Sequence, residues 1–164
     1  MLNYDGYEDL IVQMLTRDGW LVSPLPSVAD IDNPQPVSNP RIYVIFTGST
    51  FEDSDRLGEF AQDETLTFEV YIHARSRDGE KGVFAVVEEV IQKIIKQRLP
   101  DATQRTVLTS FSYVRGLQNI WQYVLKFTFP CIRIMPEPEI DPLLIKQITI
   151  SSFVKVKSDT DEEI

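Results

Sequence analysis

Cysteine and histidine are almost absent from this sequence: its 164 residues include one of each, Cys131 and His73. A single thiol cannot form an internal disulfide, so a disulfide scaffold is excluded and a reducing compartment is the simplest location. One histidine without a cluster of cysteines also speaks against a zinc site. A thiol nucleophile would need His73 as its base, and nothing in the sequence places the two together. We therefore expect Cys131 in the core and His73 at the surface or in an interface.

Long apolar segments are missing too. No run of residues approaches the ~18 apolar positions that span a bilayer. The first ten residues, MLNYDGYEDL, lack the basic region and the continuous apolar region of a signal peptide. We therefore expect a soluble protein that is not exported by a recognisable signal.

Basic residues are outnumbered by acidic ones, 16 Lys and Arg against 25 Asp and Glu, which gives a formal net charge of -9. Such an acidic surface repels phosphate groups, so tight binding of nucleic acid through general electrostatics is not expected. The same surface would allow DNA to pass without adhering to it.

Signatures of catalysis are also missing, although the many carboxylates make a metal-dependent nuclease an alternative. Such a nuclease commonly has an acid on one strand and Glu-x-Lys on the next, but Glu69 is followed by Val70 and Tyr71, so the lysine is missing. Glu137 and Glu139 precede prolines, which favour a loop. No Walker-type glycine loop, GxGxxG or HExxH motif is present. We therefore expect no enzymatic activity, no cofactor and no bound metal.

What the sequence does contain is strong strand patterning. Residues 65–75 and 119–133 alternate between apolar and polar side chains over unusual lengths, which predicts two long strands. Residues 107–114 predict another strand, which forms an antiparallel hairpin with 119–133 because Gly116 permits a turn. Shorter strands are predicted over residues 20–22 and 41–46.

Helix patterns are fewer. An apolar stripe from Tyr7 to Leu15 predicts a first helix with Asp5 as its N-cap. The one long helix pattern covers residues 79–99, with Asp78 as its candidate N-cap. Between these elements, five prolines predict an exposed loop over 23–40, and clustered acids predict a mobile loop over 47–62.

The predicted strands are longer than the predicted helices can cover. At ~3.3 Å per strand residue and ~1.5 Å per helix residue, the last strand would reach ~50 Å and the long helix ~30 Å. Apolar strand surface is therefore expected to lie against another subunit. The predicted fold class is α+β: a mixed, mainly antiparallel β-sheet flanked by two α-helices, with a long β-hairpin and an extended C-terminal arm. The predicted domains are residues 1–135 and an acidic, proline-punctuated arm, 136–164.

Aromatic residues are concentrated on the predicted hairpin. A base-stacking platform would need a basic flank, which is missing. The simplest interpretation is that these aromatic residues form core beneath two helices. The strand lengths instead favour a mixed interpretation, in which the middle of the strands is core and the strand ends form an interface. The residues concerned are Phe111, Tyr113, Trp121, Tyr123, Phe127 and Phe129.

The order of these elements resembles that of the phage tail terminator (tail completion) proteins of Mu-like and lambda-like phages. The segments that carry the resemblance are YEDLIVQML, RIYVIFTGSTF, TLTFEVYIHARSRDGEKGVFAVVEEVIQKI and WQYVLKFTF, within residues 4–134. The resemblance implies a structural virion protein that forms a hexameric ring on the head-proximal end of the tail tube. It implies no enzymatic activity and no cofactor.

Such a ring would stop polymerisation of the tube and present an attachment surface to the neck. The implied partners are other copies of the chain, the tail tube protein, the neck or connector protein and, if the tail is contractile, the last ring of the tail sheath. Genomic DNA would pass through the ring without specific binding, and the protein would reside in the host cytoplasm during assembly. The alternative is another head–tail connector, stopper or tube-like structural protein.

Nine residues are predicted to contact a neighbouring subunit or partner. Arginine pairs well with carboxylates, so the arginines after the strand at 65–75 would form a natural ring contact with an acidic neighbour. The nine are Phe51, Asp53 and Asp55 in the acidic loop, Glu69, Tyr71 and His73 on the polar strand face, Arg75 and Arg77 at the end of that strand, and Arg115 at the hairpin tip.

Overall fold

The computed structural model describes residues 3–25, 38–52, 61–117 and 119–134. The chain divides into two units, Met1–Ile134 and Met135–Ile164. The second unit lies outside the described residues, so the C-terminal arm and the domain boundary remain predictions.

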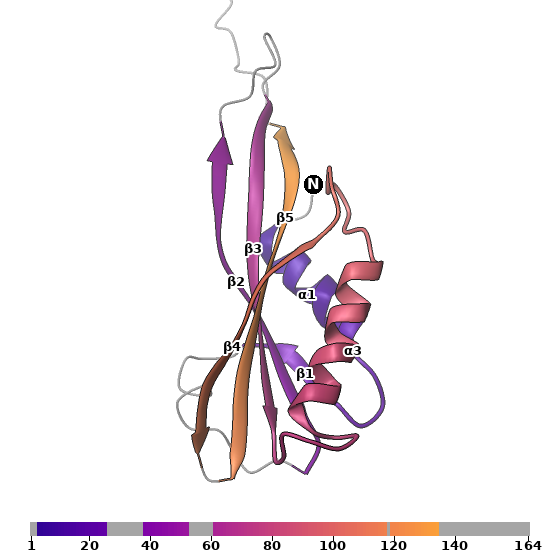
Figure 1. Ribbon diagram of the computed structural model, residues 1–164. Coiled ribbons are helices and arrows are strands. Elements are labelled where there is room, and N and C mark those ends of the chain that lie inside the picture. Colours follow the sequence, from indigo (N-terminus) through magenta and orange to yellow (C-terminus); the bar gives the residue numbers. More distant parts are fainter. Residues whose placement is uncertain (1–2, 26–37, 53–60, 118, 135–164) are drawn as a thin grey trace, which may run out of the picture. The chain divides into compact units, whose positions relative to one another are not determined.

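Within the described residues of the first unit, two helices accompany a five-stranded mixed sheet, so the predicted α+β class is confirmed (Figure 1). The strand order is β1-β2-β3-β5-β4, in which β1 and β2 are parallel and the other neighbours are antiparallel. The elements are α1 (Tyr4–Leu15), β1 (Leu21–Pro24), β2 (Arg41–Glu52), β3 (Ala61–Ala74), α3 (Val83–Lys96), β4 (Val107–Leu117) and β5 (Ile120–Ile134).

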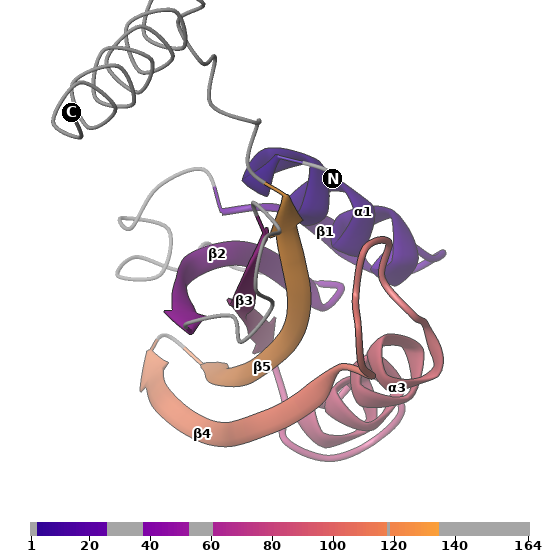
Figure 2. The ribbon, with the colours of Figure 1, turned by 90° about the horizontal axis from the view of Figure 1, so that it is seen from above.

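The core lies between one face of the sheet and both helices (Figure 2). Tyr7 of α1 packs on Phe129 of β5, with ring centroids 5.3 Å apart, and Phe84 of α3 packs on Tyr123 of β5 at 5.8 Å. Because successive residues of a strand point to opposite faces, these contacts place both helices on the same face. The predicted stripe of β3 is buried there, at Leu66, Phe68, Val70, Ile72 and Ala74.

Both helices begin at other residues than predicted. The N-cap of α1 is Asn3, whose Oδ1 accepts a hydrogen bond from the Gly6 N–H at 2.9 Å, whereas Asp5 lies in the first turn. The N-cap of α3 is Gly82, four residues after the predicted Asp78. A Cβ at Gly82 would lie 2.5 Å from the backbone of Asp78, so only glycine fits this tight entry turn.

The strands extend beyond their predicted ends. β2 continues from Phe46 to Glu52, although the sequence predicted a loop from residue 47. The reason is a β-bulge between Phe46 and Gly48, after which β2 pairs again with β3. β4 likewise includes Gly116, and the hairpin turn uses Asn119 in a left-handed conformation, with φ of 61°. The predicted antiparallel hairpin itself is confirmed.

Of the two helices described, neither is long and apolar enough to cross a membrane. Cys131 is buried in β5, as predicted.

Candidate assembly surface

Strand β4 is the most exposed element of the sheet. It forms one edge, and apart from Leu108 and Arg115 all of its side chains are exposed. Val107 and Tyr113 each expose 54 % of their surface, which is high for apolar and aromatic residues. The exposed large hydrophobic residues of β4 are Val107, Phe111, Tyr113, Val114 and Leu117. A long edge strand with apolar side chains is a template for pairing with another chain.

Cross-strand aromatic contacts hold the side chains of β4 in place. Phe111 stacks on Tyr123 of β5 with ring centroids 5.1 Å apart, and Tyr113 lies 5.4 Å from Tyr123 and 6.0 Å from Trp121. The hairpin therefore divides by strand, and not between middle and ends as the strand lengths favoured: β5 supplies core, while Phe111 and Tyr113 in the middle of β4 are exposed. The burial pattern of β4 could not be read from its sequence, because apolar residues alternate there as in a buried strand.

The opposite edge of the sheet is covered only in part, along the first half of β2. β1 has only four residues, pairs with Arg41–Val44 of β2 and ends in Pro24, which has no N–H to donate. Beyond β1, the Glu8 carboxylate of α1 accepts the Phe46 N–H of β2. Phe51 lies exposed near the end of β2. The predicted contact residues Asp53 and Asp55 lie outside the described residues.

The helix-free face of the sheet contains the predicted polar strand residues, but they differ in exposure. Glu69 accepts a hydrogen bond from the Tyr71 hydroxyl at 2.9 Å and lies 3.7 Å from Lys126 Nζ. Burial, together with this hydrogen bond to Glu69, raises the pKa of Tyr71 to about 12. Both side chains are half-buried and lie on the surface of this face.

The sequence predicts His73 at the surface or in an interface, but within the subunit its side chain is buried. The side chain is 1 % exposed and lies edge-on to Tyr43, with ring centroids 5.3 Å apart. The register aligns His73 with Arg41 of β2 and Gln122 of β5, and Gln122 is fully buried as well. Alternation distinguishes the two faces of a strand, but it does not show that the helix-free face is covered at this end.

The predicted arginines lie at the same end of the sheet. The Arg77 guanidinium lies over the rings of Phe84 and Trp121, at 5.1 and 5.2 Å from their centroids. Arg115 Nε donates a hydrogen bond to Gln122 Oε1 at 3.1 Å, and Arg75 is exposed just after β3. Arg77 is therefore held by aromatic contacts while its charge stays accessible.

A buried ion pair at the other end was missed by the sequence analysis. Glu64 accepts hydrogen bonds from Arg133 Nε at 2.6 Å and from the Tyr4 hydroxyl at 3.0 Å. Burial would raise the pKa of Glu64, but hydrogen bonds from Arg133, Ser49 and Tyr4 outweigh it and lower this pKa. The group ties α1 to β3 and β5. The only sign of this ion pair in the sequence is an acidic residue, Glu64, directly before the predicted strand at 65–75.

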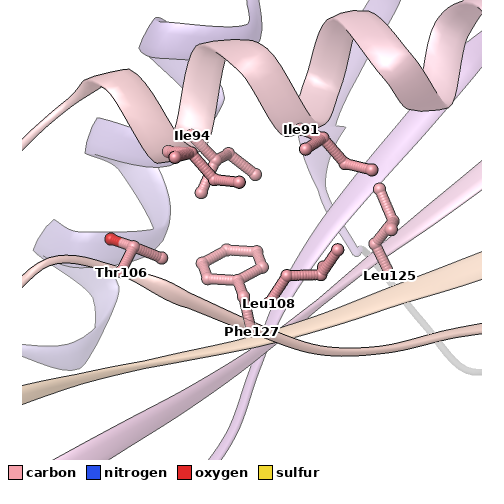
Figure 3. A pocket seen from close by; sticks show the side chains of 7 residues that line it. Ile91, Ile94, Thr106, Leu108, Leu125 and Phe127 are labelled. Carbon is pink, nitrogen blue, oxygen red and sulfur yellow. The ribbon is translucent and has the colours of Figure 1, made fainter.

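The cavity between α3 and the sheet is too small for a substrate (Figure 3). Its volume is about 10 Å³, the space of a single water molecule. It is lined by Ile91, Ile94, Ile95, Thr106, Leu108, Leu125 and Phe127. Among the residues that the structure describes, no group of three or more His, Cys, Asp or Glu side chains is placed to hold a metal ion.

Comparison with protein families matches residues 25–151 to the model of a family described as Gp37 protein. This range contains α3 and strands β2 to β5 and leaves out α1 and β1. Comparison with the curated proteins finds no match.

Proposed function

Because this chain belongs to the Gp37 family of phage-related proteins, we propose that it is a structural virion protein that terminates the phage tail. In this proposal, six copies form a ring on the head-proximal end of the tail tube. The ring stops addition of tube protein and provides the attachment surface for the neck, and for the last sheath ring if the tail is contractile.

The observation that carries the proposal is the exposed edge strand β4. An exposed edge strand with apolar side chains marks a surface that is complete only with a partner. β4 presents Phe111 and Tyr113 to solvent on an edge that no described strand covers. A closed ring would cover such an edge in every copy and leave none free for further growth.

Charge supports the proposal in two ways. The net charge of -9 suits a channel through which DNA passes without adhering. At one end of the sheet, Arg75 and Arg77 are exposed and offer guanidinium groups to the carboxylates of a neighbouring subunit or of the tube.

Removal of the gene from the phage that encodes it tests the proposal. We expect overlong tails without heads in electron micrographs, because nothing would stop the tube or join it to the neck. A plasmid copy of the gene should restore normal tail length. Tails of normal length joined to heads would refute a terminator.

The position of the protein in the particle separates the terminator from the alternative. A tagged chain in isolated tails should appear once, at the head-proximal end of the tube. A tag on the head after tail removal would favour a connector or stopper, and a tag along the whole tail would favour a tube protein.

A further inference from the structure

The sheet has two unlike edges that are open over much of their length. β4 has no strand neighbour on its outer side among the described residues. On the other side, β1 pairs with Arg41–Val44 and Glu8 of α1 accepts the Phe46 N–H, and no described strand pairs with Thr47–Glu52 along that edge of β2. A chain with two different edges can join head to tail, which generates rings when the rotation closes.

The two edges differ in charge. Beside the β4 edge, Arg105 is exposed just before the strand and Arg115 lies within it. Beside the open part of β2, Glu52 is exposed at the end of the strand and is aligned with Asp63 of β3. Contact between unlike edges therefore brings opposite charges together, whereas contact between two β4 edges brings like charges together.

Strand direction is consistent with this contact. Antiparallel pairing along β2, β3, β5 and β4 makes β4 run opposite to β2. A rotation about a ring axis keeps the direction of each strand along that axis, so β4 of one copy meets β2 of the next as an antiparallel strand. The start of β4, next to Arg105, then lies toward the end of β2, at Glu52.

We propose that β4 pairs with the open segment Thr47–Glu52 of β2 in the next copy, so that the sheets of neighbouring subunits are continuous around the ring. This inference rests on the proposed ring. The contact covers the exposed side chains of β4 and supplies hydrogen-bond partners to both edges.

Engineered disulfides test the contact directly. The register places Thr50 of β2 and Ser110 and Ser112 of β4 on the helix-free face, and all three are exposed. Neighbouring strands in a closed ring are shifted along one another, so two registers are tested with two double variants. One combines Thr50→Cys with Ser110→Cys, and the other combines Thr50→Cys with Ser112→Cys. The buried Cys131 is left in place.

After oxidation of the purified protein and of isolated tails, at least one double variant should give a ladder on a non-reducing denaturing gel, in steps of 18.9 kDa. Each single variant is the matched control and should remain monomeric. Dimers from Ser112→Cys alone would show that two β4 edges pair and would overturn the inference. Absence of a ladder from both double variants, in protein and in tails, would also overturn it.

A charge exchange gives a second readout that does not depend on register. Arg105→Glu should weaken association of the subunits by about fivefold, and Glu52→Arg in the same chain should restore it. Both side chains are exposed, so folding should be unchanged by circular dichroism. No rescue by the second substitution would count against the contact. If these tests fail but the gene deletion gives overlong tails, the contact between β4 and β2 is refuted and the tail terminator is not. If the gene deletion gives normal tails joined to heads, the tail terminator itself is refuted.

Discussion

Removing the arginine from the buried ion pair between Glu64 and Arg133 should destabilise the protein and reverse the pH dependence of this site. The Glu64 side chain is 0 % exposed and that of Arg133 is 31 % exposed. In Arg133→Met the carboxylate would stay buried without its guanidinium. Loss of one partner of a buried pair costs about 3–5 kcal/mol, and the partial exposure of Arg133 places the expected loss near the lower end, at about 3 kcal/mol. For a chain of this size, the melting temperature would fall by roughly 6–12 °C.

The pH dependence follows from the direction of the pKa change. In the native protein the pKa of Glu64 is lowered from 4.5, so the pair contributes stability above that value and loses it as the pH falls through the folded pKa. In Arg133→Met, burial would dominate and raise the pKa of Glu64. The folded state would then bind the proton more readily than the unfolded chain, and stability would increase as the pH falls from 7.

Urea denaturation of both proteins between pH 7 and pH 5 measures this difference. The free-energy gap between wild type and Arg133→Met should be largest at pH 7 and shrink toward pH 5. The matched control is Glu64→Gln with Arg133→Met, which removes the charge and should recover part of the loss at pH 7. A gap below about 1 kcal/mol that does not change with pH would refute the argument that Arg133 neutralises a buried carboxylate.

Three further predictions concern single side chains. Thr106→Val should leave stability unchanged or raise it by about 1 kcal/mol in urea denaturation, because Thr106 Oγ1 is buried with no hydrogen-bond partner among the described residues; a loss above that amount would contradict this. In an alkaline titration followed by ultraviolet absorbance, the Tyr71 phenol should ionise near pH 12, and Glu69→Gln should lower its pKa toward 10. An unchanged titration would argue against the contact between Tyr71 and Glu69. Burial raises the pKa of Cys131 to about 11, so thiol reagents at pH 8 should label this residue only after addition of denaturant. Rapid labelling of the native protein would show that β5 is open at Cys131.

The elements of the fold were largely predictable because their signals are local. Alternation in residues 65–75 and 119–133 predicted β3 and β5, and a helical stripe predicted α3. The ends were less predictable. Gly82 rather than Asp78 caps α3, because the entry turn leaves no room for a Cβ, and β2 continues past Phe46 because a bulge restores its pairing with β3.

The sequence by itself determined the two long strands, the helix pair, the buried Cys131 and the mismatch between strand and helix lengths, since each depends on spacing or composition along the chain. Only the tertiary structure decided that β4 lies at an edge, that His73 is buried and that Glu64 pairs with Arg133. The reason is physical. Periodicity reports which side chains share a face, but which strand lies beside which, and what covers each face, depends on contacts between residues far apart in the chain.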